Sequence, residues 1–201
     1  METLYTSHQL EIPWVLSDGT RVLLRPLAPT DRNRLKRGFA LMSNESIYFR
    51  FLTPMSKLSS AYLKFLTNID QKNHIAWCAI DPANPDFPGF GVGRFIRLAD
   101  IPEVAEFAIT VIDACQKKGL GTVLLAVLYL IAERSDVRAL RAMSSPENHA
   151  VVKLLSNFNL EASFANGMLQ LDFPVYSDRE LLPQTCFGRK FRKLLDQLEE
   201  A

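Results

Sequence analysis

The chain has 201 residues, which suits a single domain, and 48% of them are hydrophobic, so it has ample material for a core. Its formal net charge of +1 argues against general nucleic-acid binding, which needs an excess of Lys and Arg to neutralise phosphates. Its three cysteines are odd in number and have no His at metal-ligand spacing. Neither a disulfide framework nor a metal site is predicted, and a reducing compartment is expected.

The first 14 residues lack the basic start and apolar segment of a signal peptide. The most apolar stretch, residues 123–132, is about half of what a bilayer requires. We therefore predict a cytoplasmic protein that has neither a membrane nor a nucleic acid as partner.

Turn residues at 17–20 precede a strand at 21–25, and we expect residues 1–20 to form an N-terminal extension with the first strand of a hairpin. Helical spacing of apolar residues predicts helices from Thr30 to about Met42 and from Ser59 or Ser60 to Ile69. The runs that follow predict strands at 75–80, 91–98 and 104–111.

The second half of the chain continues with a helix at 122–134, a strand at 139–144, a helix at 148–158, and strands at 160–165 and 168–173. The helix at 122–134 is apolar almost all round, as for a helix buried against a sheet. Asn166-Gly167 is a strong two-residue hairpin signal. The order predicts a mixed α/β fold, a sheet of about six to seven strands flanked by about four helices, over residues 20–173.

A C-terminal extension, residues 174–201, is expected to end in an amphipathic helix with Phe187, Phe191, Leu194, Leu195 and Leu198 facing inward. Its basic first turns are either a solvated face or a dock for an acidic partner or a second copy of the chain in a homodimer.

The run from 104 to 111 is the most informative strand. Its alternation directs Phe107, Ile109 and Val111 to one face, and Glu106, Ala108 and Thr110 to the other. The second face is small and polar apart from one carboxylate, which favours Glu106 as a candidate for acid–base chemistry. The structural alternative is an ion pair between Glu106 and Arg94 or Arg97 on a neighbouring strand.

This strand is joined to the apolar helix by the loop Gln116-Lys117-Lys118-Gly119-Leu120-Gly121-Thr122. The two glycines let backbone N–H groups approach a ligand closely, and the helix presents its free N–H groups and positive dipole end to the same place. Lys117 and Lys118 add charge. The loop predicts a diphosphate site; the alternative is a plain tight turn before a helix.

Nucleotide-binding motifs fit the loop poorly. A P-loop has Lys-Ser/Thr after its second glycine, which is missing here. A dinucleotide fingerprint needs a third glycine, and that position is Leu124.

The loop resembles motif A of the GNAT N-acetyltransferases, Q/R-x-x-G-x-G/A, at Gln116, Gly119 and Gly121. Asn148, shortly after the next strand, is similar to a residue common at the start of the following helix in that family. The predicted hairpin lies where the family has its last two strands. The resemblance implies the GNAT fold and acetyl-CoA, with no metal.

The same resemblance implies that backbone amides of residues 117–122 hold the coenzyme A diphosphate and that the pantetheine arm lies along residues 109–111. The residues that it places around acetyl-CoA are Ile109, Thr110, Val111, Gln116, Lys117, Lys118, Gly119, Leu120, Gly121, Thr122 and Asn148.

Segments 16–26, 43–51 and 105–108 look like bacterial protein-lysine acetyltransferases and the GNAT domains fused to ADP-forming acyl-CoA synthetases. In that group the glutamate of the A-E-F/V-A strand is regarded as the general base, which corresponds to Glu106. The resemblance implies direct transfer of acetyl to a primary amine, either a protein lysine or a small amine.

The sequence departs from the family pattern in two places. Leu155 stands where the family often has a Tyr that protonates the leaving thiolate, and Asn159-Leu160 replaces a common Gly-Phe pair. Two other functions stay open: a non-catalytic acyl-CoA-binding sensor or interaction module, and a nucleotide-using enzyme with an unusual phosphate loop. The aromatic run at 48–51 either packs in the core or shapes the acceptor pocket.

Overall fold

The computed structural model describes residues 10–158, 160, 162–165 and 167–201. One sheet runs through them in the order β1-β2-β3-β4-β5-β6-β8-β7. Its strands are β1 (Ile12–Val15), β2 (Arg21–Pro26), β3 (His74–Ile80), β4 (Gly91–Arg97), β5 (Val104–Val111), β6 (Ala139–Ser144), β7 (Ala162–Ala165) and β8 (Met168–Pro174). Only the β5–β6 pair is parallel; the other neighbours are antiparallel.

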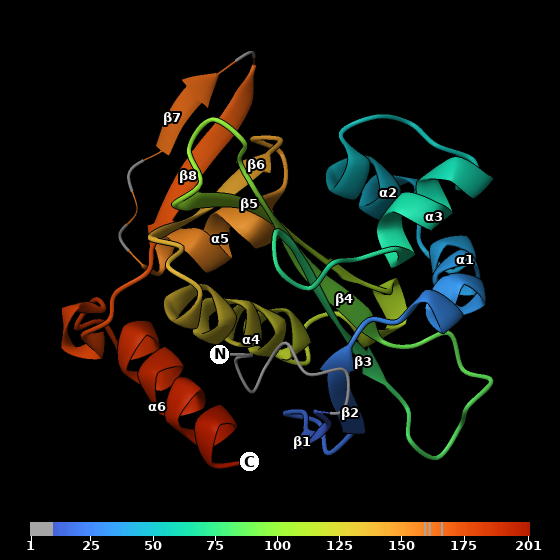
Figure 1. Cartoon of the computed structure of the whole chain (residues 1–201), viewed down its shortest axis with the longest axis horizontal. Coiled ribbons are helices and arrows are strands. Elements are labelled where there is room, and N and C mark those ends of the chain that lie inside the picture. Colours follow the sequence, from blue (N-terminus) through green and yellow to red (C-terminus); the bar gives the residue numbers. More distant parts are fainter. Residues whose placement is uncertain (1–9, 159, 161, 166) are drawn as a thin grey trace.

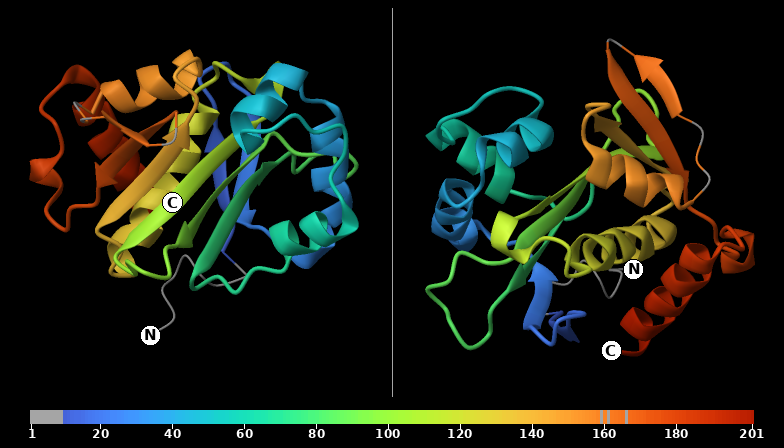
Figure 2. Two further views of the ribbon diagram at one scale, coloured as in Figure 1. Left: turned by 90° about the horizontal axis from the view of Figure 1, so that it is seen from above. Right: turned by 180° about the vertical axis from the view of Figure 1, so that it is seen from behind.

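The helices lie on both faces of this sheet. They are α1 (Arg32–Ala40), α2 (Asn44–Phe51), α3 (Ser60–Thr67), α4 (Leu120–Arg134), α5 (His149–Ser156) and α6 (Cys186–Glu200). Helices α1, α2 and α3 gather on one side, while α4 and α6 lie on the other (Figures 1 and 2). The protein is therefore a three-layer α/β structure.

Helix α4 is the centre of the core. Every residue from Val123 to Ala132 is buried, because the sheet covers one side of α4 and α6 packs against the other. Gly93 of β4 lets this helix approach closely, since a Cβ there would lie 3.2 Å from Leu124. Helix α6 joins the same core through Phe191, whose ring packs edge-on against Tyr129 of α4.

Most elements confirm the pattern-based expectations. Among the described residues the sheet has eight strands, against about six to seven expected, and there are six α-helices, against about four in the domain and one in the C-terminal extension. Strand β1 is the hairpin strand expected in the N-terminal extension, and it pairs with β2 across a turn where Gly19 has φ 85°. The unexpected helix is α2, whose N-terminus is capped by Ser43 through a bond from the Ser46 N–H.

Two predicted helix starts are shifted. Thr30 does not cap α1, because residues 29–31 form a 3-10 turn in which the buried Asp31 carboxylate accepts bonds from Arg25 and from the Ala28 N–H. Helix α4 begins at Leu120 rather than at 122, so Gly121 is already helical.

The hairpin strands β7 and β8 are confirmed, and Gly167 between them has φ 75°. Asn159, Asn166 and residues 1–9 lie outside the described residues. The limits at 20 and 173 of the predicted domain stay predictions. Within the described ranges, no helix combines the length and the apolar character needed to cross a bilayer.

Candidate active site

A gap opens between β5 and β6. Their parallel pairing runs from Val104 with Ala139 to Phe107 with Ala142 and ends there, whereas β5 stays paired with β4 up to Val111. The Ile112 N–H donates to the Phe90 carbonyl (3.1 Å), and antiparallel ladders alternate in direction, so the backbone N–H and C=O groups of Ile109 and Val111 point into the gap. We call this opening the splay.

The loop after β5 has the backbone geometry of an anion site. Lys117 and Gly119 both have left-handed φ angles, 62° and 86°, and Gly119 occupies the N-cap of α4. Among the described residues, the N–H groups of 117–121 donate to no backbone carbonyl, while Thr122 donates to the Gly119 carbonyl (3.0 Å). Five consecutive donors are thus free at the positive end of a buried helix.

The two lysines of the loop differ. Lys117 is exposed. Lys118 forms an ion pair with Asp18 (2.9 Å), and this hydrogen bond lowers the pKa of Asp18 to about 2. The Ser17 hydroxyl also donates to the Lys118 carbonyl (3.0 Å), so the β1–β2 turn is hydrogen-bonded to the loop.

The Gln116 side chain fixes the loop to its surroundings. Its Nε2 donates to the Val111 carbonyl (3.2 Å) and to the hydroxyl of Ser46 in α2 (3.2 Å). It also approaches Asp113 (3.3 Å), which accepts bonds from the Ser43 N–H (2.7 Å) and the Ser46 hydroxyl (2.6 Å). Gln116 therefore positions the loop relative to β5 and α2.

Asn148 begins α5. It is buried, and its Oδ1 accepts a bond from the Val151 N–H (3.3 Å). In the structure it is a helix cap. Leu155 lies in the same helix.

Glu106 lies on the face of β5 that sequence alternation predicts. Its register neighbours are Ile96 of β4 and Arg141 of β6, and Arg141 forms a bidentate pair with Asp172 of β8 (2.7 Å and 2.7 Å). Glu106 is exposed and forms no ion pair with Arg94 or Arg97. The alternation places Arg97 on the opposite face, where it bonds to backbone carbonyls of Pro102 and Ser135.

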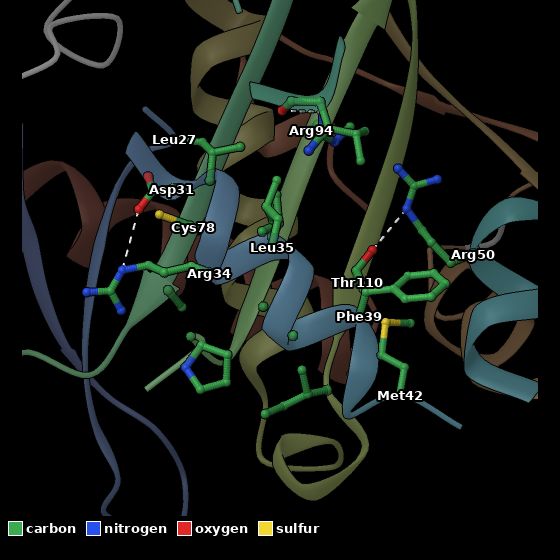
Figure 3. A pocket seen from close by; sticks show the side chains of 18 of the residues that line it. Leu27, Asp31, Arg34, Leu35, Phe39, Met42, Arg50, Cys78, Arg94 and Thr110 are labelled. Atoms are coloured by element: carbon green, nitrogen blue, oxygen red, sulfur yellow. Dashed lines mark hydrogen bonds and ion pairs between the residues drawn. The ribbon is translucent and has the colours of Figure 1, made fainter. Parts of the chain in front are cut away.

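A cavity of about 70 Å³ lies on the same face of the sheet, under α1, α2 and α3 (Figure 3). Its walls are largely apolar, with Leu35, Phe39 and Leu66 among them. Asp31 and Arg34 lie at one end, and Arg50 with Thr110 at another (Figure 3).

Within the aromatic run at 48–51, Phe51 and Tyr48 differ in environment, and the role of the run in an acceptor pocket stays a prediction. Phe51 lines the cavity and packs against Phe39, with ring centroids 5.8 Å apart. Tyr48 is exposed.

Two of the cavity residues that carry a guanidinium group differ in burial: Arg94 is buried, and Arg50 is partly exposed. Arg94 of β4 is 5% exposed and donates to the Leu66 carbonyl (3.2 Å), and its Nη1 lies 3.0 Å from Nε2 of His74. Arg50 of α2 donates through Nε to the hydroxyl of Thr110 (2.9 Å). Burial, and then the positive charge of Arg50, lower the pKa of Arg94 to about 9. Sequence patterns missed Arg50, because α2 was not expected.

The described side chains contain no group of three or more His, Cys, Asp or Glu placed to hold a metal ion. Three features described above belong to β5 or to the loop after it: the splay, the free loop amides and the face that carries Glu106. The strand, loop and helix follow one another in the order of motif A. Residues 21–160 match the family model of the acetyltransferase (GNAT) domain. The chain belongs to the GNAT family. Membership supports acyl transfer as the general activity.

Several GNAT relatives resemble the chain over most of its length. Acetyltransferase PA5475 of Pseudomonas aeruginosa is 31% identical over 140 residues, 69% of this chain and 75% of that protein. Acetyltransferase Pat of Mycolicibacterium smegmatis is 27% identical over 193 residues, which cover 94% of this chain and 54% of Pat. The chain thus spans about half the length of Pat.

Solved GNAT structures share the fold. The crystal structure of the GNAT domain of S. lividans PAT has a TM-score of 0.74 at 27% identity, covering 82% of this chain and 96% of that domain. A cAMP-binding acyltransferase from Mycobacterium smegmatis has a TM-score of 0.60 at 22% identity, covering 95% of this chain and 55% of that one.

Proposed function

We propose that the chain is an N-acetyltransferase that moves an acetyl group from acetyl-CoA to a primary amine by direct attack in a ternary complex. One observation carries the proposal: the unpaired end of β5 is followed, after a 3-10 turn at residues 113–115, by five free amides at the start of α4. A long thin molecule with a diphosphate at one end and hydrogen-bonding amides along its arm fits that path.

The donor's diphosphate binds the N–H groups of residues 117–121, where the helix dipole and Lys117 add positive potential. The N–H and C=O groups of Ile109 and Val111 bond the amides of the pantetheine arm, as an added strand does at a sheet edge. This places the thioester in the splay, near Ala108.

Glu106 acts as the general base. It lies two residues before Ala108 on the same face of β5. Its exposure allows a water molecule to relay the proton from the acceptor ammonium. The neutral amine attacks the thioester carbonyl, and a free backbone N–H of β5 stabilises the oxyanion. A thiol of ordinary pKa, about 8.5, leaves without a strong acid, so Leu155 in place of Tyr is compatible with turnover.

The acceptor that the sequence resemblance implies is a protein lysine, with small amines as the second option. An acetyl-CoA-binding sensor without activity is the alternative function. It predicts binding of acetyl-CoA with no thiol release for any amine.

The test is Glu106→Gln, measured as release of free thiol from acetyl-CoA in the presence of a panel of peptide and small amines. Turnover should fall roughly 10²- to 10⁴-fold, the usual contribution of a general base, while acetyl-CoA affinity stays nearly unchanged. Glu103→Gln is the matched control, because Glu103 is exposed and lies just before β5. Full turnover of Glu106→Gln at neutral pH would show that the base is another group.

A further inference from the structure

The cavity under α1, α2 and α3 holds two arginines without a carboxylate partner. No ion pair links Arg50 or Arg94 to an acidic residue anywhere in the described parts of the chain. By contrast, Arg34, at another end of the cavity, is 3.6 Å from the carboxylate of Asp31. The two arginines instead bond to neutral groups: a backbone carbonyl, the His74 ring and the hydroxyl of Thr110.

This arrangement is costly for a protein on its own. A charge without a counter-ion gives up hydration that bonds to neutral groups replace only in part, and two like charges near each other add repulsion. Burial lowers the pKa of both guanidinium groups, and Tyr62 and then Glu106 offset the effect on Arg50 only in part. The His74 ring is neutral at neutral pH, because burial and then Arg94 lower its pKa to about 4. A bound anion removes this cost.

The pair lies beside the place of acyl transfer. Arg94 is the register partner of Ala108, and Arg50 reaches Thr110, the next residue on that face of β5. Ala108 is also where the splay begins. An anion held by these two guanidinium groups is therefore part of the molecule whose amine meets the thioester.

We propose that Arg50 and Arg94 form a carboxylate subsite of the acceptor pocket, so that the acceptor is an amine that also carries a carboxylate. The inference rests on the proposed acetyltransferase function. Two planar guanidinium groups match the two oxygens of a carboxylate, and a cavity of about 70 Å³ with apolar walls admits a small planar anion. The carboxylate comes from a free amino acid or from an acidic residue beside an acceptor lysine.

The first experiment compares acceptors with the wild-type chain, by thiol release at saturating acetyl-CoA. ω-Amino carboxylates of increasing length are paired with alkylamines of the same length, and lysine peptides with a neighbouring Asp or Glu are paired with the Asn or Gln versions. We expect kcat/KM to be about 10- to 100-fold higher for the carboxylate member of at least one series, the factor that a charge-assisted hydrogen bond supplies. The series that responds identifies the source of the carboxylate. Equal values in both series overturn the inference.

The second experiment compares Arg50→Gln with Arg37→Gln. Arg37 is exposed on α1, so its loss removes the same charge without altering the cavity. Arg50→Gln should raise KM for the preferred carboxylate acceptor about 10- to 100-fold and leave the matched neutral amine unchanged, while Arg37→Gln changes neither. An equal loss for both acceptors overturns the inference. If Arg50→Gln does not fold, the wild-type comparison decides alone.

The two proposals fail differently. Absence of thiol release with every amine, while acetyl-CoA binds in calorimetry, contradicts the acetyltransferase function. Equal kcat/KM values for carboxylate-bearing and neutral acceptors contradict only the carboxylate subsite.

Discussion

Alanine substitutions at the two loop glycines separate folding from ligand binding. A Cβ at Gly119 or at Gly121 would meet no atom within 4 Å, so neither change causes a clash. Gly119 has φ 86°, where an L-residue costs about 1–2 kcal/mol, whereas Gly121 is helical, where alanine gains about 0.5–1 kcal/mol. Gly119→Ala should therefore be less stable than Gly121→Ala by about 2 kcal/mol.

For a domain of this size that difference separates the two melting temperatures by roughly 4–8 °C. Both variants should nevertheless bind acetyl-CoA about tenfold or more weakly in calorimetry, because the added methyl group occupies the open space that a diphosphate needs to reach the amides. Weaker binding by the more stable variant cannot come from unfolding. Gly167→Ala in the β7–β8 turn, with φ 75° and no atom near its Cβ, is the matched control for strain alone. Unchanged binding by Gly121→Ala refutes the placement of the diphosphate.

Three further outcomes follow from charges and burial. Asp18→Asn releases Lys118 from its ion pair, so acetyl-CoA should bind a few-fold more tightly at low salt, and the gain should vanish at high salt. Burial and Arg94 lower the pKa of His74 from 6.5 to about 4, so stability that is full above pH 6.5 is lost as pH falls toward 4; urea titrations of His74→Gln should show a smaller loss. Of the cysteines only Cys186 is exposed, so a thiol reagent should label one in the folded chain and three after unfolding.

Sequence patterns were sufficient for the part of the site that is one continuous segment, from β5 through the loop to α4. The alternation of β5 and the all-apolar α4 depend on which faces are buried, and the hairpin signal before β8 depends on a glycine that can take a positive φ; a sequence records both directly. The loop between β5 and α4 is likewise one continuous segment, so its glycines and its helix start were readable together.

Contacts between distant segments were not readable. The ion pair of Lys118 with Asp18 joins residues 100 positions apart, and Arg50 reaches Thr110 over 60 positions. Helix α2 has eight residues and no regular apolar stripe, so only Ser43 at its N-cap signalled it. Arg94 was weighed as a partner of Glu106, yet tertiary packing directs it to His74 and α3.

The Asp113 carboxylate connects the two halves of the site. Burial alone raises its pKa, but bonds from Ser46 and Ser43 outweigh that effect, so the pKa is lowered and Asp113 stays ionised. Those two serines begin α2, and the last turn of the same helix carries Arg50. Asp113 also lies within 3.3 Å of Gln116, which holds the loop against the end of β5. Because α2 and the loop are tied to one strand, the distance from the diphosphate amides to Arg50 is set by rigid elements, which is the condition for placing an amine and a thioester in reacting geometry.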